Sequence, residues 1–341
     1  MTASSADKAL IVIPCLNEIK HLPGLLDGLL KGDPAWHVVV ADGGSTDGSV
    51  EFVADLAQRH ANLTLLPNPQ RIQSAGINLA VRRFGAGMRW LVRIDAHCGY
   101  PDGYVEGLIA AAGRTGATSV VVPMITRGQA CFQRAAAAAQ NSVLGAGGSA
   151  HRKIGQAQFV DHGHHALFDL SAYAAAGGYD ESFSHNEDAE LDLRLVEAGA
   201  KIWLEPSLAI VYYPRSNPAA LFRQYIKYGE GRARTMQRHR PRMKVRQIAP
   251  LFVAPAVALL ILAPALWLLA LPAAVWAAAC LAMGVVLALR ARSACVLMSG
   301  PAAMIMHLAW SIGFWRRLPA GREAFHGLPS ITSHDPRGKL V

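Results

Sequence analysis

Residues 36–47, with the sequence WHVVVADGGSTD, join a run rich in valine to a turn that holds two glycines and two aspartates. An earlier apolar run, Ala9–Pro14, is separated from it by residues 18–30, where leucines recur on one helical face. Apolar runs of this length are typical of buried strands, and the stretch between them is typical of an amphipathic helix. The chain therefore begins with a predicted β-α-β unit.

The same alternation continues along the chain. Helices are expected at 48–60, 72–84, 102–112, 129–140, 188–198 and 218–234, and strands at 63–66, 90–94 and 119–122. In the helix at 188–198, Leu191, Leu195 and Val196 are expected to point inward. Loops are expected at 180–186 and, rich in glycine, through Gly148. This order predicts an α/β fold with a Rossmann-like, mostly parallel sheet, whose ligands bind at the carboxyl ends of the strands.

The formal net charge of +9 is concentrated in one segment. Between Arg223 and Arg246 there are nine lysines and arginines and one acid, Glu230, which gives +8 and leaves +1 for the rest of the chain. This segment runs directly into an apolar stretch, a placement typical of cations that meet lipid headgroups. A nucleic-acid-binding domain would spread its basic residues over a folded face. We therefore expect membrane lipids as partners, and no nucleic acid.

The last third of the chain is strongly apolar. Residues 248–289 contain almost no charge, and a further apolar stretch covers residues 295–315. At about 20 residues per span, the first stretch predicts two helices broken near Leu271-Pro272. Three complete spans cannot place all the flanking arginines on one side of a membrane, so one segment is expected to be re-entrant or interfacial. The alternative is the buried helical core of a soluble protein.

The cysteines and the start of the chain indicate the compartment. Five cysteines, none in a CxxC spacing, indicate neither a zinc site nor a disulfide framework, and a reducing cytoplasm fits them; they are Cys15, Cys98, Cys131, Cys280 and Cys295. The apolar run that ends at Pro14 is too short for the core of a signal peptide. We expect the first part of the chain to remain in the cytoplasm.

Acidic residues follow two of the predicted strands at the point where each ends. Asp42 opens the turn at 42–47, and Asp95 lies in the segment Arg93-Ile94-Asp95-Ala96-His97. The carboxyl ends of parallel strands meet at one edge of a sheet, so we expect these turns to share a site. Carboxylates accept hydrogen bonds from the N–H groups of a base and from ribose hydroxyls. Asp47, by contrast, is expected to cap the next helix.

The segment Pro14-Cys15-Leu16-Asn17-Glu18, followed by the Asp-Gly-Gly-Ser-Thr-Asp turn, resembles the first two loops of family 2 glycosyltransferases, which have the GT-A fold. Further similarity, in 68–76, 93–97, 100–101, 185–190 and 228–232, resembles the ExoA-type enzymes of succinoglycan and related exopolysaccharide synthesis. The resemblance covers roughly residues 9–235 and a similar membrane tail. It implies that the nucleotide sugar is bound by Pro14, Asn17, Glu18, Asp42, Arg71 and Asp95.

The Asp95-Ala96-His97 segment occupies the position of the family's Asp-x-Asp motif, whose last member ligates a divalent cation. The resemblance implies a metal site at Asp95 and His97, with Mn²⁺ or Mg²⁺ as the cofactor. Imidazole is a good ligand for Mn²⁺, whereas Mg²⁺ prefers oxygen, so the histidine predicts a preference for Mn²⁺. Without this context, an Asp-x-His triplet would be read as the cap of a turn.

Glu187-Asp188 at a predicted helix start resembles the family's Glu-Asp motif, which makes Asp188 the catalytic base of an inverting transfer. A carboxylate that takes the proton of an acceptor hydroxyl speeds such a step about 10²–10⁴-fold. Alternatively, both acids merely complement the helix dipole. The resemblance further implies contacts to the acceptor or the diphosphate from His164, Glu187, Gln224, Lys227 and Arg232.

Several of these residues have competing interpretations. The run Asp161-His162-Gly163-His164-His165 suggests either a metal cluster or, as we favour, a loop on the acceptor side. Gln224-Tyr225-Ile226-Lys227-Tyr228 stands where processive relatives carry Gln-x-x-Arg-Trp, and the weaker match favours single addition over polymerisation. Lys227, Arg232 or Arg234 neutralise either the departing diphosphate or anionic lipids.

The resemblance implies an inverting, metal-dependent transfer of a sugar, often glucose, from a UDP-sugar to a polyprenyl-diphosphate-linked oligosaccharide at the bacterial inner membrane. The expected organisation is a cytoplasmic GT-A domain at 1–235, a basic juxtamembrane segment at 236–247, a membrane region of two to three helices at 248–317 and a polar tail at 318–341. The alternatives are a polyprenyl-phosphate sugar transferase and a non-catalytic membrane-anchored nucleotide-sugar-binding subunit. A dinucleotide oxidoreductase is disfavoured because no G-x-G-x-x-G follows the first strand.

Overall fold

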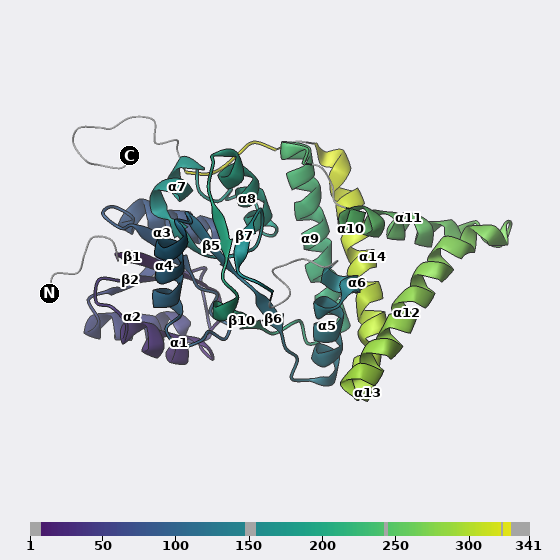
Figure 1. Ribbon diagram of the computed structural model, residues 1–341, viewed down its shortest axis with the longest axis horizontal. Helices are drawn as coiled ribbons and strands as arrows, with labels where there is room; N and C mark the ends of the chain where they lie inside the picture. The colour runs from purple at the N-terminus through teal and green to yellow at the C-terminus, as the bar shows by residue number, and fades with distance from the viewer. Residues whose placement is uncertain (1–7, 147–154, 242–244, 322, 329–341) are drawn as a thin grey trace. The chain divides into compact units, whose positions relative to one another are not determined.

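The computed structural model describes residues 8–146, 155–241, 245–321 and 323–328. The chain divides into two compact units, which we call the sheet unit, within 1–123, 155–210 and 325–341, and the helical unit, within 124–154 and 211–324. Figure 1 labels the elements along the chain. The stretch 1–235, expected as one contiguous domain, is distributed over both units, and the loop expected through Gly148 lies partly outside the described residues.

The sheet unit is built on an eight-stranded sheet of order β3-β2-β1-β4-β8-β5-β9-β7. Its strands are β1 (Ala9–Cys15), β2 (His37–Asp42), β3 (Leu63–Pro67), β4 (Trp90–Arg93), β5 (Ser119–Val122), β7 (Gln158–Val160), β8 (His164–Asp169) and β9 (Ile202–Leu204). The first four strands are parallel to one another, as are β5 and β9, whereas β8 runs antiparallel to both β4 and β5. This confirms the mostly parallel α/β fold.

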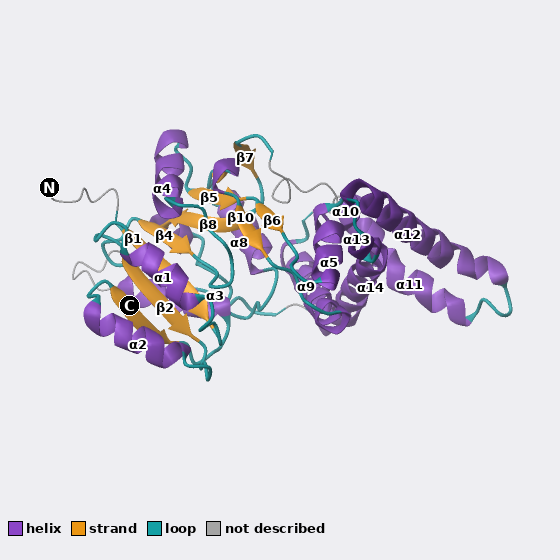
Figure 2. Ribbon diagram, turned by 90° about the horizontal axis from the view of Figure 1, so that it is seen from below, coloured by secondary structure: helices purple, strands orange, loops and turns teal. Residues whose placement is uncertain are grey.

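Helices cover the sheet because alternate strand residues point to opposite faces. They are α1 (Leu22–Leu30), α2 (Ser49–Arg59), α3 (Gln73–Phe84), α4 (Tyr104–Thr115), α7 (Leu170–Ala175) and α8 (Glu187–Glu197). Leu10 and Val12 of β1 belong to one buried cluster with residues of α3, α7 and α8. Figure 2 shows the strands in orange among these helices. Because β1, β2 and β4 are parallel neighbours, their carboxyl ends share one edge of the sheet.

Two local predictions in this unit need correction. Helix α1 begins at Leu22 and not at Glu18, because Pro23 occupies its first turn and residues 18–21 form a separate turn. In α8, Leu191 and Leu195 are buried, but Val196 is 45% exposed and does not point inward. The helical period alone places Val196 at the margin of the apolar face.

The segment expected as a polar tail contributes to the core of the sheet unit. Leu328 is 8% exposed within the buried cluster, and its N–H donates to the carbonyl of Gly177 at 2.7 Å. The carbonyl of His326 accepts from the N–H of Glu181 at 2.7 Å. The ring of Phe325 lies 4.7 Å from the Arg194 guanidinium. These contacts fasten the 325–328 segment to α8 and to the loop before it.

The helical unit contains most of the remaining helices. They are α5 (Cys131–Asn141), α6 (Val143–Ala146), α9 (Pro218–His239), α10 (Val245–Ile248), α11 (Val253–Ala258), α12 (Leu271–Ala291), α13 (Ala294–Leu297) and α14 (Ser299–Arg317), and a small sheet pairs β6 (Met124–Thr126) with β10 (Ile210–Tyr212). Helices α9 and α14 approach closely at Gly229 and Gly313. A Cβ at either glycine would meet a carbonyl of the other helix at about 2 Å, namely Trp310 O and Ile226 O.

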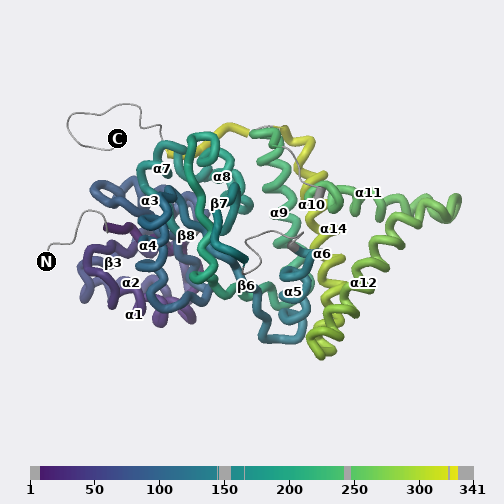
Figure 3. The backbone as a smooth tube through the Cα atoms, in the orientation of Figure 1, coloured from purple at the N-terminus to yellow at the C-terminus, as the bar shows by residue number. Residues whose placement is uncertain are grey.

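Among the described residues, two segments are long and apolar enough to cross a membrane, Trp267–Ala291 and Ala294–Ala320, and a shorter apolar helix covers Ala249–Ile261. The first is only 17% buried, whereas the second is 44% buried. The chain reverses between α11 and α12 (Figure 3), so the break expected near Leu271-Pro272 is wrong. Pro272 lies in the first turn of α12, where its missing N–H costs no helical hydrogen bond.

A disulfide joins Cys131, at the start of α5, to Cys295 in α13. This contradicts the prediction that the cysteine spacing indicates no disulfide. The two residues are 164 positions apart, and only the packing of the helices brings their Cα atoms to 5.1 Å. The cysteine spacing therefore gives no support for a reducing compartment.

Candidate active site

The turn after β2 is organised around Asp42. Its carboxylate accepts hydrogen bonds from the N–H groups of Gly44 at 2.7 Å and Ser45 at 2.9 Å, and its side chain is 6% exposed. Gly44 has φ +90°, a conformation that a side chain would strain. The exposed Arg71 lies over this turn, because a Cβ at Gly44 would meet its guanidinium at 3.5 Å. Arg71, from the segment after β3, thus lies beside the turn that Asp42 organises.

The loop after β1 is locked to this turn by hydrogen bonds in both directions. The N–H of Asn17 donates to Ser45 Oγ at 2.8 Å, and Asn17 Oδ1 accepts from the N–H of Thr46 at 2.8 Å. Asn17 itself has φ 59°. Asp47 accepts from the N–H groups of Ile19 and of Ser49, the first residue of α2, so it ties the loop to that helix. The N-cap position of α2 is Gly48 and not Asp47, so the expected cap by Asp47 is wrong. The first two loops form one surface.

Asp95 is held at the carboxyl end of β4. Its Oδ1 accepts from Gln73 Nε2 at 2.8 Å and lies 3.3 Å from Arg93 Nε, and its N–H donates to the hydroxyl of Tyr100 at 2.7 Å. Burial raises the pKa of Asp95, but the charge of Arg93, followed by those of His164 and His97, lowers it to about 2. The carboxylate is therefore ionised at neutral pH.

His97 contacts Glu18 of the loop after β1. Its Nδ1 lies 2.9 Å from Glu18 Oε1, and about half of the side chain is exposed. If Nδ1 carries the proton that Glu18 accepts, Nε2 presents its lone pair outward. A carboxylate on the far nitrogen is the usual support for a metal-binding imidazole.

Asp95 and His97 fit a cation only as part of a ligand set. Among the described residues, no group of three or more His, Cys, Asp or Glu side chains is arranged to hold a metal ion. Oδ1 of Asp95 is engaged by Gln73 and Arg93, so Oδ2 remains for a cation. Cations bound with a nucleotide often take one or two protein ligands and complete their shell with phosphate and water. The geometry is compatible with such a site.

Asp188 lies in the first turn of α8, and the buried Arg93 joins it to Asp95. Arg93 Nη1 is 2.6 Å from Asp188 Oδ1, and Arg93 Nη2 is 3.6 Å from Glu187 Oε1. The hydroxyl of Tyr179 donates to Asp188 Oδ1 at 2.7 Å. The guanidinium of Arg93 therefore contacts both Asp95 and Asp188, which are 93 residues apart in sequence.

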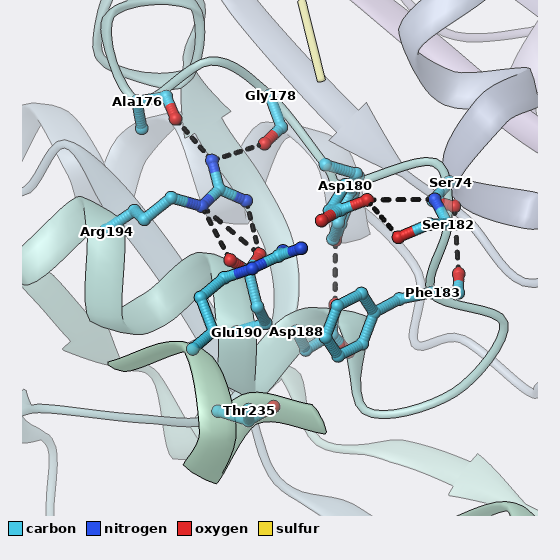
Figure 4. Close-up of polar contacts among 12 residues, drawn as sticks. Ser74, Ala176, Gly178, Asp180, Ser182, Phe183, Asp188, Glu190, Arg194 and Thr235 are labelled. Carbon is cyan, nitrogen blue, oxygen red and sulfur yellow. Dashed lines mark hydrogen bonds and ion pairs between the residues drawn. The ribbon is translucent and has the colours of Figure 1, made fainter. Parts of the chain in front are cut away.

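Polar contacts hold α8 and the loop before it in place (Figure 4). Arg194 pairs with the buried Glu190 and donates to the carbonyls of Ala176 and Gly178. In the preceding loop, the side chain of Asp180 accepts from the N–H of Ser182 at 2.9 Å. These bonds fix the loop at 180–186, which the sequence predicted, and with it the place of Asp188.

His164 lies between the two groups of acids. Its Nε2 is 3.8 Å from Asp95 Oδ2, and its Nδ1 is 3.8 Å from Asp188 Oδ2. The expected loop at 161–165 is only partly a loop, because His164 begins strand β8. Strand β8 inserts between β4 and β5, and this long-range pairing supplies the register that places His164 at the site edge. His162 is not part of this group and pairs with Asp192.

Glu187 carries the clearest effect of crowding. Burial and the adjacent charge of Asp188 raise the pKa of Glu187 to about 7, against the lowering influence of Arg93. Because the folded pKa lies above the ordinary value of 4.5, this group reduces stability as the pH rises from 4.5 to about 7.

Glu187→Gln removes this dependence. We expect the variant to gain about 4 °C in thermal midpoint relative to the wild type at pH 8, and little at pH 4.5. Differential scanning fluorimetry of the detergent-solubilised protein at both pH values measures the difference, and Glu197→Gln, an exposed acid on the same helix, is the control. Equal shifts at both pH values would contradict the assignment.

The predicted residues Gln224, Lys227 and Arg232 belong to α9 of the helical unit, so their place at this site remains a prediction. Gln224 Nε2 donates to the hydroxyls of Tyr212 and Tyr228, at 3.0 and 2.9 Å. Lys227 pairs with Glu230 at 3.1 Å, and Arg232 Nη2 donates to Gln247 at 2.9 Å.

Three side chains that organise the site, Arg93, Tyr179 and Gln73, were assigned no role from the sequence motifs. Arg93 gave a signal, since an arginine two residues before a strand-end aspartate is unusual in an otherwise apolar strand. Tyr179 and Gln73 gave none, because their contacts depend on long-range packing.

Comparisons with known proteins identify the family of this chain. The family model for Glycosyl transferase family 2 matches residues 10–175, which include the turns of Asp42 and Asp95. Succinoglycan biosynthesis protein ExoA of Rhizobium meliloti (strain 1021) is 51% identical over 316 residues, which cover 92% of this chain and 96% of that protein. A more distant relative is the dolichyl N-acetyl-alpha-D-glucosaminyl phosphate 3-beta-D-2,3-diacetamido-2,3-dideoxy-beta-D-glucuronosyltransferase of Methanococcus voltae. It is 23% identical over 230 residues, which cover 64% of this chain and 71% of that protein.

Among solved structures, the mannosyltransferase PcManGT from Pyrobaculum calidifontis, in complex with GDP-Man and Mn²⁺, matches with a TM-score of 0.59. The match covers 91% of this chain and 87% of that chain at 19% identity, so it speaks for the fold alone. The identity to the Rhizobium meliloti protein extends over nearly the whole of both chains. This chain therefore belongs to glycosyltransferase family 2 and is a glycosyltransferase with a GT-A fold.

Proposed function

We propose that this glycosyltransferase moves a sugar, with inversion and with the aid of a divalent cation, from a UDP-sugar to a polyprenyl-diphosphate-linked oligosaccharide in exopolysaccharide synthesis. The observation that carries the proposal is the convergence of Asp95 and Asp188 on one buried arginine, Arg93. Asp95 follows the carboxyl end of β4, and Asp188 lies in the first turn of α8. A donor diphosphate and an acceptor hydroxyl need these two positions.

The transfer step follows from this arrangement. The oxygen of the acceptor hydroxyl forms a bond to the anomeric carbon while the bond from that carbon to the diphosphate oxygen breaks. Asp188 takes the proton of the hydroxyl, and the nucleoside diphosphate leaves with its electron pair. Attack from the face opposite the leaving group inverts the anomeric configuration. Asn17, Glu18, Asp42 and Arg71 bind and orient the donor nucleotide.

A cation at Asp95 and His97 would neutralise charge on the departing diphosphate. We predict that Mn²⁺ supports faster transfer than Mg²⁺ at equal concentration, and that His97→Asp reduces this preference by about tenfold, because it replaces a nitrogen ligand by oxygen. Initial rates after EDTA treatment and addition of each metal test this, with His21→Gln as control. A wild-type enzyme that works faster with Mg²⁺ would contradict it.

The donor and acceptor classes come from the relatives. The name of the Rhizobium meliloti protein refers to succinoglycan biosynthesis, and that of the Methanococcus voltae protein refers to a dolichyl-linked sugar phosphate. The second name supports a long-chain isoprenoid acceptor. The resemblance to exopolysaccharide enzymes supports a sugar nucleotide, with glucose as the first candidate. Gln224, Lys227 and Arg232 of α9 are proposed to contact the acceptor or the diphosphate, and the cations of α9 to contact anionic lipid.

The proposed location is the bacterial inner membrane, with the sheet unit in the cytoplasm; the helical unit supports the association with a membrane. Figures 1 and 2 show α11 and α12 as the two arms of a hairpin. Large apolar side chains along this hairpin are exposed, among them Ile261 at 81%, Trp267 at 68%, Val275 at 66% and Leu289 at 73%. Such a surface is unfavourable in water and suited to acyl chains. Confining enzyme and lipid-linked acceptor to one plane raises their effective concentration.

The test is a screen of UDP-, GDP- and dTDP-sugars against membranes that contain the protein, with isoprenoid-linked acceptors, with and without Mn²⁺. Transfer of labelled sugar from a UDP-sugar only, dependent on metal, is expected. Product mass separates extension of a lipid-linked oligosaccharide from the alternative, direct transfer to a polyprenyl phosphate. A purified protein that binds UDP-sugar but neither hydrolyses nor transfers it would instead be a nucleotide-sugar-binding subunit.

A further inference from the structure

Oδ1 of Asp188 belongs to a closed triangle of polar contacts. Arg93 Nη1 lies 2.6 Å from Asp188 Oδ1, the Tyr179 hydroxyl lies 2.7 Å from the same oxygen, and Arg93 Nη1 is 3.1 Å from the hydroxyl. Both donors are buried, since Arg93 is 5% exposed and Tyr179 is 0% exposed. Asp188 keeps 18% of its side chain exposed. Two buried donors therefore bind Oδ1 of Asp188, while part of the carboxylate stays exposed.

Oδ2 of Asp188 has no hydrogen-bond partner within the part of the chain that the structure describes. His164 Nδ1 lies 3.8 Å from this oxygen, which is beyond hydrogen-bond distance. Nε2 of the same imidazole faces Asp95 Oδ2, also at 3.8 Å. Oδ2 thus lies on the side of His164, whose imidazole stands between Asp188 and Asp95.

Contacts that do not involve Asp188 fix the position of Tyr179. The N–H of Tyr179 donates to Asn78 Oδ1 at 3.1 Å and to the Tyr173 hydroxyl at 3.0 Å, and its carbonyl accepts from Asn78 Nδ2 at 2.8 Å. Its ring packs edge-on against Phe168 and Tyr173, with centroids 6.1 and 5.7 Å apart. Arg93 is fixed independently, by the register of β4 in the sheet.

We propose that Arg93 and Tyr179 are positioning residues that clamp Oδ1 of Asp188, so that Oδ2 is the oxygen that takes the proton of the acceptor hydroxyl. The proposal rests on the role of Asp188 as base. The acceptor then approaches from the side of His164. Because two rigid donors fix one oxygen, the carboxylate cannot rotate to present the other, and it needs no reorganisation as the proton arrives.

A purely structural role for the cluster makes a different prediction. Arg93 and Tyr179 would then fasten α8 to the sheet, and removing one hydroxyl would lower stability without a selective effect on turnover. Tyr173 allows the two to be separated. It is as buried as Tyr179, and its hydroxyl donates to Asn78 Oδ1 at 2.7 Å and accepts from the N–H of Tyr179 at 3.0 Å. Without that hydroxyl the N–H of Tyr179 still donates to Asn78 Oδ1, so Tyr173→Phe leaves Tyr179 held in place. Within the described residues, no hydrogen bond joins the Tyr173 hydroxyl to Asp188.

The test compares Tyr179→Phe with Tyr173→Phe in the full-length protein in membranes or detergent. Each substitution removes one buried hydroxyl and keeps the ring. We expect Tyr179→Phe to lower kcat about tenfold or more, since it removes a bond to the base, with the dissociation constant for the donor unchanged. Tyr173→Phe should lose as much thermal stability and keep at least half of kcat. Equal kcat values in the two variants, or parallel losses of donor affinity and kcat in Tyr179→Phe, would overturn the clamp.

A double variant separates this proposal from the proposed function. If Tyr179 acts through the base, Tyr179→Phe should not lower the residual rate of Asp188→Asn any further. Additive losses would mean that Tyr179 acts elsewhere and would overturn the clamp. An inactive Asp188→Asn with a fully active Tyr179→Phe would overturn the clamp alone. A fully active Asp188→Asn would overturn both, because the clamp would then hold no base.

Discussion

Asp188→Asn is expected to lower the rate of sugar transfer about 10²–10⁴-fold, the loss typical of removing a general base. The amide keeps the shape of the carboxylate, and its oxygen can still accept from Arg93 and Tyr179 at the position that Oδ1 occupies. It has no basic oxygen to take the proton of the acceptor. The defect should therefore appear in kcat, with the donor dissociation constant changed by no more than about twofold.

The measurement is transfer of labelled sugar by membranes that contain equal amounts of each protein, together with calorimetric titration of the UDP-sugar into purified protein. Glu197→Gln, on the exposed side of the last turn of α8, is the matched control and should keep wild-type activity. If Asp188→Asn retained wild-type transfer, the base would have to be another group, and His164 would be the first to examine because it lies 3.8 Å from Asp188.

Arg93→Met is expected to have the second large effect, on stability and activity together. The guanidinium lies beside the carboxylates of Asp95, Glu187 and Asp188, and its own pKa is raised well above the ordinary value: burial lowers it, but the three acids, Asp188 foremost, outweigh burial. Breaking a buried pair by removing one partner typically costs about 3–5 kcal/mol, because the remaining charges stay buried and unpaired. Transfer should fall below detection.

The pH dependence distinguishes this charge effect from a packing defect. Without Arg93, the pKa values of the carboxylates rise, and the cost of the variant is largest when they are ionised. The loss of thermal midpoint should therefore be greater at pH 8 than at pH 5. Arg89→Met, an exposed cation that stacks 4.6 Å from the Trp90 ring, is the control and should cost about 1 kcal/mol or less at either pH. An equal loss for Arg93→Met at both pH values would indicate a packing defect.

The order of strands and helices in the first 122 residues was predictable because it is written in local periodicity. The valine-rich run before Asp42 is buried on both faces of the sheet, as expected of a short apolar run that forms a central strand. Leu22 and Leu26 of α1 are buried at the spacing of one helical turn. The errors occurred where local signals compete. Helix α1 begins at Leu22, with Pro23 in its first turn, and not at Glu18. The reversal of the chain before Trp267 lies within an unbroken apolar run that contains no local signal for it.

Strand β8 shows a limit of another kind. Its sequence begins with His164-His165 in a segment predicted as a loop, and its pairing partners, β4 and β5, end 71 and 42 residues earlier. Nothing in the local pattern indicates that a strand enters the sheet there and runs antiparallel. The disulfide between Cys131 and Cys295 was missed for the same reason, since spacing in sequence carries no information about distance in space.

The sequence by itself determined that acids stand at the ends of strands and at the start of a helix, because capping, turn chemistry and periodicity are local. Only the tertiary structure decided which acids meet and what holds them. Arg93 became the common partner of Asp95 and Asp188 because β4 and α8 pack together, and Tyr179 turned one oxygen of Asp188 inward because its ring was already fixed in the core. Buried charges are tolerated only when partners surround them, and those partners come from distant parts of the chain.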